Sequence, residues 1–249
     1  SPILGYNSKE GIVYQFWANR DSHDVNYFDP KTDYAPTTAI SSVSWDDSNF
    51  PNIEGFGVWA AKCNFTMGPD GKMYSRMLGG NLVRIDVENA RGENLTNGDL
   101  VGTKDGSAYG LVFDPQDENV FYFSNNDKHC IYKYDLRTKE WACWAGQEGK
   151  SGYLDGPIGQ AMFNKPGQMC VDSEGNIILT DTENHCIRKI TMSTGYVSTL
   201  AGKPQNSGYV NGSAEDAQFK KPLGICIDND DVMYIGDSEN RAIRRLAVE

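Results

Sequence analysis

The sequence predicts an all-β protein built from repeated antiparallel sheets. Composition is one indication, because 13 Tyr, 10 Phe and 5 Trp together with 26 Gly suit short strands joined by tight turns. Internal repetition is the second, since residues 163–190 recur 56 positions later as residues 219–246. The third is the alternation of apolar and polar side chains between turn sequences rich in Asp, Asn and Gly.

Each clear copy of the repeat contains three predicted strands. In the copy at 163–190 the strands are MCV, IILT and CIRKI, separated by the turn sequences DSEGN and DTEN. A fourth strand, YVSTL, follows this copy, and Gly195 supplies the turn before it. Six residues of this copy recur at equivalent positions of the next, which are Phe163, Pro166, Asp172, Asp181, Asn184 and Ile187.

Three weaker copies lie upstream. Residues 111–135 carry the pattern with a longer hairpin, and the strand EWACWAG follows them. Residues 65–86 keep the strands but lose the polar turn, and residues 3–29 align with 111–135 so that His23 falls on His129. The chain therefore contains five units, the last of which ends after its third strand.

Units of this size predict a β-propeller. A four-stranded sheet repeated every ~40 to 60 residues cannot bury its own faces, so neighbouring sheets must pack on one another around a common axis. We therefore expect residues 1–249 to form a single β-propeller domain of four-stranded antiparallel blades.

The repeat also resembles a known family. The segments FNKPGQMCVD, NIILTDTENHCIRKI and TLAG resemble NHL repeats, and AGQEGKSGYLDG and AGKPQNSGYVNG resemble the loops that join their blades. Such propellers usually have six blades, whereas five are visible in this sequence. Two alternatives follow: a six-bladed ring from which residues before Ser1 have been removed, or a five-bladed ring whose N-terminal segment pairs with the last blade.

Charge and hydropathy argue against nucleic acid as a partner and against a transmembrane segment in this chain. Lys plus Arg number 23 against 34 Asp plus Glu, a net charge of −11, and phosphate binding depends mainly on basic side chains. No apolar run approaches the ~18 residues of a membrane span. The N-terminal residues also lack the basic and apolar segments of a signal peptide.

The six cysteines are predicted to be free and mostly buried thiols. They form no CxxC motif, and two pairs recur at the repeat offset, Cys130 with Cys186 and Cys170 with Cys226. Equivalent points of neighbouring blades are held apart by the architecture, so disulfides between them are not expected.

The stretch DTENHCIRKI, residues 181–190, has the side chains of a metal or catalytic cluster. It forms the loop between the second and third strands, and His23, His129 and His185 occupy the same position in three copies. Equivalent points of adjacent blades should lie roughly 10 Å or more apart, whereas zinc ligands must lie about 2 Å from one ion. No metal site is predicted at these histidines.

A structural role is predicted for most of this stretch. Asp181 and Asp237 should accept hydrogen bonds from backbone amides two residues on, and Asn184 and Asn240 should adopt the unusual backbone angles of the turn. Four basic residues follow on an outer strand and should face solvent: Arg188, Lys189, Arg244 and Arg245. Three further residues should fix the hairpins after the first strands: Asp114, Asp172 and Asp228.

Departures from the repeat are the better candidates for a ligand site. The longest departure is the segment 41–62 between the first two blades. The later blade-joining loops, with Tyr153 and Asp155 and with Tyr209 and Asn211, and the second-to-third-strand loops are expected on the same face. Aromatic rings beside carboxylates and amides suit a sugar, whose apolar face stacks on a ring while its hydroxyls need planar polar partners. The candidate ligand-binding residues are Trp45, Asp46, Trp59, Tyr153, Asp155, Tyr209, His185 and Arg241.

Packing between blades is the alternative role for two of these side chains. Tyr153 and Tyr209 lie in loops that also lead to Phe163 and Phe219, which should wedge between neighbouring blades.

Catalysis is an alternative with less support. The chain has no GxSxG, HExxH or P-loop motif, and the adjacent carboxylates Asp46 and Asp47 point apart if the backbone is extended. No cofactor is predicted, although the acidic composition leaves open a calcium ion near the axis, bound by oxygen ligands.

The preferred function is a noncatalytic binding module whose open face holds a carbohydrate or a protein partner. The last two repeats resemble most closely the NHL propellers of gut-type bacteria, often surface lipoproteins with an immunoglobulin-like (IPT/TIG) domain ahead of the propeller. That resemblance implies an extracytoplasmic, glycan-associated role at the bacterial cell surface. Since such proteins are often labelled hydrolases, a glycan-active hydrolase or lyase is one alternative, and a protein-interaction scaffold is another.

Overall fold

The chain divides into two compact units. The first comprises residues 1–107 with 136–139, and the second comprises residues 108–135 with 140–249. The structure, a computed structural model, describes the following residues: 3–7, 12–18, 23–28, 36–40, 44–45, 65–76, 82–86, 91–96 and 110–247.

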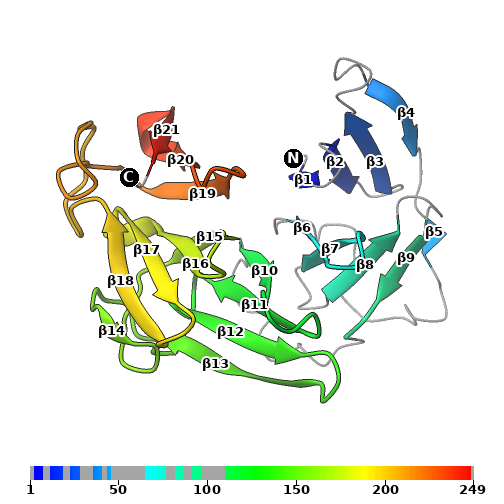
Figure 1. Ribbon diagram of the computed structural model, residues 1–249, viewed down its shortest axis with the longest axis horizontal. Coiled ribbons are helices and arrows are strands. Elements are labelled where there is room, and N and C mark those ends of the chain that lie inside the picture. The colour runs from blue at the N-terminus through cyan, green and yellow to red at the C-terminus, as the bar shows by residue number, and fades with distance from the viewer. Residues whose placement is uncertain are drawn as a thin grey trace. The chain divides into compact units, whose positions relative to one another are not determined.

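The strands described in the first unit form two sheets. The first sheet is antiparallel and pairs its strands in chain order (Figure 1): β1 (Ile3–Asn7), β2 (Ile12–Ala18), β3 (His23–Phe28) and β4 (Pro36–Ile40). The second sheet is antiparallel except for the pair β5 and β9, and its order is β5 (Ser44–Trp45), β9 (Arg91–Asn94), β8 (Leu82–Asp86), β7 (Met73–Arg76) and β6 (Phe65–Met67).

Three antiparallel sheets follow among the described strands of the second unit. One consists of β10 (Leu111–Phe113), β11 (Val120–Asn125), β12 (Cys130–Asp135) and β13 (Glu140–Gly146). The next has the order β14 (Gly156–Pro157), β18 (Tyr196–Ala201), β17 (Cys186–Thr191), β16 (Ile177–Asp181) and β15 (Pro166–Val171). The last consists of β19 (Pro222–Ile227), β20 (Met233–Asp237) and β21 (Ala242–Leu246).

The predicted strands of all five copies are present. Successive strands pair with their neighbours in chain order, as short hairpin connections require. Two single 3₁₀ turns, η4 (Thr182–Asn184) and η5 (Ser238–Asn240), occupy the second-to-third-strand loops of the last two sheets. We refer to the sheets as blades one to five in chain order.

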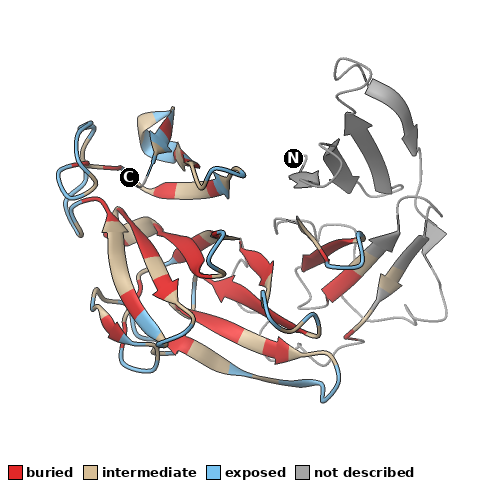
Figure 2. Ribbon diagram, in the orientation of Figure 1, coloured by how far each residue is buried: buried red, intermediate tan, exposed pale blue. Residues whose placement is uncertain are grey.

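The apolar core of the second unit lies between blades. One buried cluster joins blades three and four and includes Val112, Tyr122, Ile131, Phe163, Ile177 and Leu179. A second cluster joins blades four and five and includes Ile178, Ile187, Phe219, Ile225, Met233 and Ile235. Figure 2 shows that β16 is buried along its whole length, because its alternating side chains fill both clusters.

Hydroxyl groups on the second strands also join the blades of this unit. Ser124 donates from Oγ to the Gly167 carbonyl oxygen at 2.7 Å, and Thr180 donates from Oγ1 to the Leu223 carbonyl oxygen at 2.9 Å. A side chain at Gly167 would have no room, since an added Cβ would lie within 2.9 Å of that Leu223 oxygen and closer still to Thr180. Blade four therefore contacts blade five through its backbone as well as through apolar side chains.

The prediction for the first hairpins is confirmed. The Oδ1 atoms of Asp114, Asp172 and Asp228 accept the amide two residues on, at 2.8, 3.1 and 3.0 Å. In blade three, Tyr122 donates from its hydroxyl to Asp114 Oδ2 at 2.7 Å, and burial together with this bond raises the pKa of Tyr122.

Five of the six cysteines lie in the described residues, and all five are free thiols, as predicted. Their predicted burial is only partly correct: Cys130 and Cys186 are buried, Cys143 and Cys170 are half-buried, and Cys226 is exposed. In the described part of the chain, no helix has the length and apolar character needed to span a membrane.

Candidate functional site

The second-to-third-strand loops and the blade-joining loops lie together at one edge of the sheets of the second unit. The Glu183 amide donates to the Asn164 carbonyl at 3.0 Å, and the Gln205 amide donates to the Asn184 carbonyl at 2.8 Å. These bonds link each turn to the blade-joining loops on either side of it. The expected common face is therefore built from both kinds of loop.

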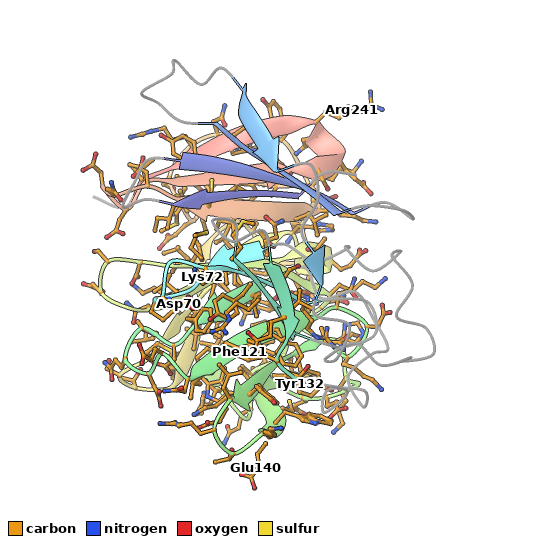
Figure 3. The ribbon with its side chains drawn as sticks, turned by 90° about the vertical axis from the view of Figure 1, so that its right-hand side faces the viewer. Asp70, Lys72, Phe121, Tyr132, Glu140 and Arg241 are labelled. Carbon is orange, nitrogen blue, oxygen red and sulfur yellow. The ribbon has the colours of Figure 1, made fainter. Side chains whose placement is uncertain are left out.

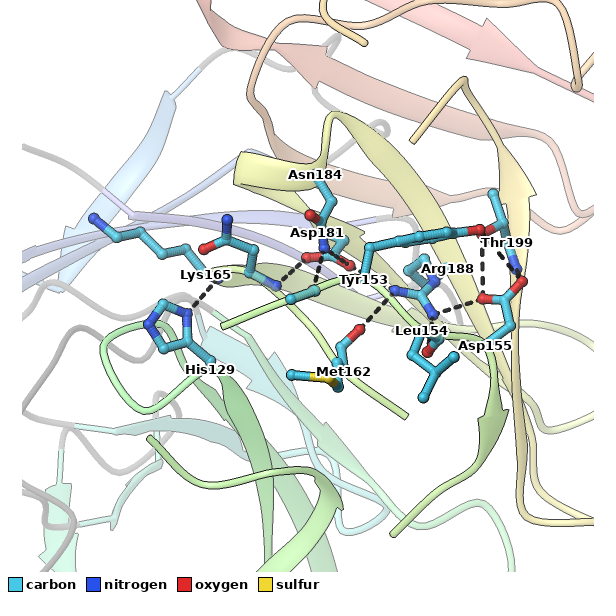
Figure 4. Close-up of polar contacts among 12 residues, drawn as sticks. His129, Tyr153, Leu154, Asp155, Met162, Lys165, Asp181, Asn184, Arg188 and Thr199 are labelled. Carbon is cyan, nitrogen blue, oxygen red and sulfur yellow. Dashed lines mark hydrogen bonds and ion pairs between the residues drawn. The ribbon is translucent and has the colours of Figure 1, made fainter. Parts of the chain in front are cut away.

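His129 and His185 have equivalent structural roles on this face. His129 Nδ1 accepts the Lys165 amide at 3.1 Å, and His185 Nδ1 accepts the Lys221 amide at 3.2 Å (Figure 4 shows the first). Both histidines have left-handed backbone angles, with φ of 55° and 59°. Burial and the nearby Lys165 hold the pKa of His129 below its ordinary value, which suits a neutral, accepting imidazole.

The left-handed position was predicted for the wrong residue. Asn184 and Asn240 belong to the 3₁₀ turns, and His185 and Arg241 follow them with φ of 59° and 53°. Asn184 instead donates from Nδ2 to Gly152 O and to Asp181 Oδ2, both at 2.8 Å. The asparagine is selected for bonds to the preceding loop rather than for its backbone freedom.

Arg188 forms the centre of a buried polar cluster in blade four. Its side chain has no exposed surface, and it pairs through Nη1 with Asp181 Oδ2 at 2.7 Å and through Nη2 with Asp155 Oδ1 at 2.6 Å (Figure 4). Nη1 also donates to the Met162 carbonyl and Nη2 to the Leu154 carbonyl. We call this set, Asp155, Asp181 and Arg188, the arginine clasp.

Aromatic rings cover the guanidinium of the clasp. The Arg188 Cζ atom lies 4.9 Å from the centre of the Tyr153 ring and 5.1 Å from that of Phe163. The Tyr153 hydroxyl is 2.8 Å from Thr199 Oγ1 on β18. Tyr153 therefore packs between the arginine and the fourth strand of the same blade.

The clasp corrects two predictions. Arg188 and Arg244 were expected on a solvated face, but they are 0% and 7% exposed. The Oδ1 atom of Asp181 bonds to the amide of Asn164 at 2.8 Å rather than to an amide of its own turn. The period-2 pattern places Arg188 on one face of its strand, and the loop entering the blade covers that face.

Burial and pairing act on the pKa values of this cluster. Burial raises the pKa of the Asp181 carboxyl to about 6, against the opposing effects of the Arg188 charge and of hydrogen bonds from Asn184 and Asn164. Burial lowers the pKa of Arg188, but Asp181, Cys186 and Asp155 together outweigh that effect, and the net pKa is raised. The guanidinium is therefore charged, as arginine is in proteins generally.

Blade five repeats the clasp with one substitution. Arg244 Nη1 pairs with Asp237 Oδ2 at 2.9 Å, while Nη2 donates to Asn211 Oδ1 at 2.8 Å. The Asp237 Oδ1 atom accepts the Lys220 amide at 2.7 Å, as Asp181 does with Asn164. Asn211 replaces the carboxylate of Asp155, so this clasp carries one negative charge fewer.

Tyr209 covers Arg244 but is far more exposed than its counterpart. The Arg244 Cζ atom lies 4.9 Å from the centre of its ring, and 61% of the residue is exposed. In blade four the fourth strand, β18, covers the matching ring, whereas no described strand lies at that place beside β21. For the same reason Ile243 is 74% exposed while its counterpart Ile187 is fully buried.

The remaining candidates are placed as follows. Arg241 projects outward from its turn (Figure 3), and His185 occupies the same position one blade earlier. Trp45 ends the short strand β5, where the side chain is not described, and Asp46 and Trp59 fall outside the described residues. The structure brings Tyr153 and Asp155 together around the guanidinium of the clasp. The loop that contains Tyr209 forms a separate site at the equivalent position of the next blade.

Two features were not identified from the sequence. They are the buried roles of Arg188 and Arg244 and the exposure of the apolar residues Leu154 and Val210 in the blade-joining loops. The sequence did contain a signal for the buried arginines, since an arginine recurs seven residues after an aspartate in both copies. Half of the exposed large apolar residues in the described chain lie in the two loops: Leu154, Tyr209 and Val210.

A surface hollow lies at the blade-joining loop that follows β18. It has a volume of about 420 Å³ and is bounded by the end of β18 and the segment that follows it. Its lining includes Thr199, Leu200, Lys203, Asn206, Ala214 and Glu215. Among the described residues, no group of three or more His, Cys, Asp or Glu side chains is arranged to hold a metal ion.

Comparisons with known proteins identify chains that are similar to this one in sequence and in structure. Residues 163–190 match the NHL repeat model. The chain is 30% identical to NHL repeat-containing protein 2 of Gallus gallus over 152 residues, which are 60% of this chain and 19% of that protein. The chain therefore spans about a fifth of the length of this relative.

Two solved structures from Bacteroides thetaiotaomicron share the fold. One, a structural genomics protein of unknown function, has a TM-score of 0.81 at 23% identity. The other, an auxiliary nutrient binding protein, has a TM-score of 0.70 at 22% identity. Each match covers 99% of this chain and 58% of the solved chain. The chain thus has an all-β propeller fold of antiparallel blades and contains an NHL repeat at residues 163–190.

Proposed function

We propose that this chain is a noncatalytic binding module whose blade-joining loops hold a carbohydrate. The observation that carries the proposal is an aromatic ring and an amide held by one arginine: Arg244 Cζ lies 4.9 Å from the centre of the Tyr209 ring, and Arg244 Nη2 donates to Asn211 Oδ1 at 2.8 Å. An aromatic face beside a planar polar group suits a sugar, because the apolar side of the sugar ring stacks on the aromatic ring.

The polar partners of such a sugar lie in the same loop. Asn211 follows Tyr209 by two residues, and its Oδ1 is held by Arg244 at 2.8 Å, which leaves the Nδ2 group to donate to a sugar hydroxyl. Because the same arginine orients the ring and the amide, both are arranged before a ligand arrives. Preorganisation of this kind lowers the entropy lost on binding.

The state of the acidic and imidazole side chains supports binding over catalysis. Asp181 and Asp237 are buried and paired with arginines, and His129 and His185 accept backbone amides. Each of these groups is therefore engaged in holding a loop, whereas a general acid or base needs access to the reacting atoms.

The comparisons support the same interpretation. One similar solved structure is an auxiliary nutrient binding protein from a bacterium. Because nutrient capture takes place outside the cytoplasm, we propose that this chain acts at the bacterial cell surface or in the periplasm. In the first unit, Trp45 and Trp59 stay separate sequence-based candidates for a sugar contact.

The test is a glycan panel screened against the wild-type chain and three variants. Tyr209→Ala should weaken binding of a retained glycan about twofold to tenfold, corresponding to the ~0.5–1.5 kcal/mol of an aromatic contact. Tyr209→Phe should bind normally, because it keeps the ring. Tyr196→Ala is the matched control, since Tyr196 is also an exposed tyrosine but lies at the opposite end of its sheet.

Two outcomes would replace the proposal. Release of shortened or unsaturated sugars during long incubation would make the chain a glycan hydrolase or lyase. Retention of no glycan, together with saturable binding of a purified protein that Tyr209→Ala weakens, would make it a protein-interaction scaffold.

A further inference from the structure

Blade three departs from the clasp at the positions where blades four and five repeat it. The residue equivalent to Arg188 is Tyr132, and the residue equivalent to Thr199 is Cys143. Cys130 is equivalent to Cys186. At these equivalent positions blade three therefore has two thiols, whereas blade four has one. The charged pair that links loop and strands in blade four is therefore replaced by a neutral, sulfur-containing group.

The two thiols lie on the same face of neighbouring strands. Cys130 on β12 pairs with Gly146 on β13, and Tyr132 pairs with Cys143, with a bulge between these two pairs. Side chains two residues apart on a strand share a face, so Cys143 is on the face of both Tyr132 and Cys130. The two cysteines are therefore diagonal neighbours, whose Cα atoms lie ~7–8 Å apart in a regular ladder, whereas disulfides bridge Cα atoms roughly 4.4–6.8 Å apart. Closing the bond requires the bulged end of β13 to move toward Cys130.

The Cys143 thiol is also directed toward its neighbour. Its Sγ donates to the Gly146 carbonyl oxygen at 3.6 Å, and Gly146 is the residue directly opposite Cys130. An added Cβ on Gly146 would lie 3.2 Å from the Cys130 Cα atom, which shows how closely the two strands approach here. A β-branched or bulky residue at Gly146 would separate the thiols.

The two sulfurs differ in access and acidity. Cys143 is half-buried and Cys130 is fully buried. A hydrogen bond with Cys130 lowers the pKa of the Cys143 thiol, and that bond together with burial raises the pKa of Cys130. The accessible Cys143 thiol is thus the better nucleophile and should react first, and the buried Cys130 thiol should react second.

We propose that Cys130 and Cys143 form an oxidisable dithiol site, which closes to an intrablade disulfide on reaction with a low-molecular-weight disulfide such as oxidised glutathione. The Cys143 thiolate attacks one glutathione sulfur, forming a mixed disulfide and releasing one glutathione. The Cys130 thiol then loses its proton and attacks Cys143 Sγ, which releases the second glutathione. Two protein thiols are oxidised, the glutathione disulfide is reduced, and the two protons leave with the two glutathione molecules.

The product would join β12 to β13 at the point where blade four uses the arginine clasp. Third and fourth strands would then be tied covalently in blade three, whereas in blade four the ion pairs of Arg188 join the third strand to the end of the second strand and to the blade-joining loop. This inference does not depend on the proposed carbohydrate binding, because it concerns a different blade and different side chains.

The experiment treats the folded full chain with oxidised glutathione, blocks the remaining thiols and maps the cysteines by tryptic mass spectrometry without reduction. Cleavage gives HCIYK, residues 129–133, and EWACWAGQEGK, residues 140–150, which should appear joined by one disulfide. The thiol count in denaturant should fall by two per chain. Cys130→Ala should stop the reaction at a Cys143–glutathione adduct, and Cys143→Ser should leave Cys130 unmodified.

Two control variants separate proximity from simple reactivity. Cys186→Ser removes the thiol equivalent to Cys130 in blade four, which faces Thr199 instead of a cysteine, and should leave the joined peptides unchanged. Cys226→Ser removes the most exposed described thiol and should also have no effect on them. The proposal is overturned if Cys143 is joined to another cysteine, or if it stays as the glutathione adduct while Cys130 is present.

Discussion

Arg188 and Arg244 hold the blade-joining loops because each buried guanidinium finds its partners there. Arg188 donates to the Leu154 and Met162 carbonyls and pairs with Asp155, all contributed by the blade-joining loop before the first strand of its blade. A buried charge without its partners is costly, so the loop cannot leave without exposing an unpaired group. The clasp is better understood as a device that specifies one loop conformation than as a source of net stability.

A set of arginine variants tests this view. Arg188→Ala should lower the free energy of unfolding by ~3–5 kcal/mol, the usual cost of breaking a buried pair. Arg244→Ala should cost less, because its clasp has an asparagine in place of one carboxylate and is slightly exposed. Urea unfolding followed by fluorescence measures both.

Arg245→Ala is the matched control for this series. Arg245 is the next residue along β21 and its side chain is exposed, so its loss should change stability by less than about 0.5 kcal/mol. Equal losses for Arg244→Ala and Arg245→Ala would show that the buried cluster adds nothing beyond an ordinary surface arginine.

The residue scale is also where prediction from sequence was least successful. Asp114, Asp172 and Asp228 were correctly assigned to hairpins because their partners lie two residues away. Asp181 was assigned to its own turn, but its partner amide lies 17 residues earlier, at Asn164. Side chains that bond locally can be predicted from sequence, and those that bond across loops cannot.

At the scale of elements, strand register is set by side chains that alternate between two buried clusters. Ile177 and Leu179 on β16 face blade three, and Ile178 faces blade five. A shift of register by one residue would exchange these sets and bring Thr180 away from the Leu223 carbonyl. This dual burial explains why the strands of the fourth copy gave a clear pattern.

Gly167 provides a test of the contact between β15, β16 and β19. Gly167→Ala should destabilise the protein by ~1–3 kcal/mol, because the new methyl group would collide with Thr180 and with the Leu223 carbonyl oxygen. Thermal unfolding by calorimetry measures the loss. The matched control is Gly159→Ala, where an added Cβ has nothing within 4 Å.

The two glycine variants are compared by how far each lowers the melting temperature. If Gly159→Ala and Gly167→Ala shift the melting temperature alike, the close approach of blade four to blade five does not exist in solution. Gly167→Ala should also speed exchange of the β19 amides, since the same collision pushes that strand outward.

At the scale of the molecule, the second unit is a chain of sheets that share their cores with their neighbours. Phe163 enters the cluster between blades three and four, and Phe219 enters the one between blades four and five. Blade four thus buries its two faces against different partners, and stability should propagate from neighbour to neighbour within this unit.

Hydrogen exchange of two phenylalanine variants tests this arrangement. Phe163→Ala and Phe219→Ala should each cost ~3–5 kcal/mol, because both rings are fully or almost fully buried. Phe163→Ala should speed exchange chiefly in β10–β13 and β15–β18, and Phe219→Ala chiefly in β15–β21. An identical, uniform increase in both variants would mean that the unit opens only as a whole.

The sequence by itself determined the repeat, the order of strands, the hairpin residues and the propeller class. All of these depend on spacing along the chain: the alternation of side chains, the turn residues and the 56-residue offset. The tertiary structure alone decided that Arg188 is buried, that Tyr153 packs under β18 and that Tyr209 stays open. The physical reason is that a strand pattern specifies which face a side chain is on, while the burial of that face depends on loops and strands contributed from elsewhere in the chain.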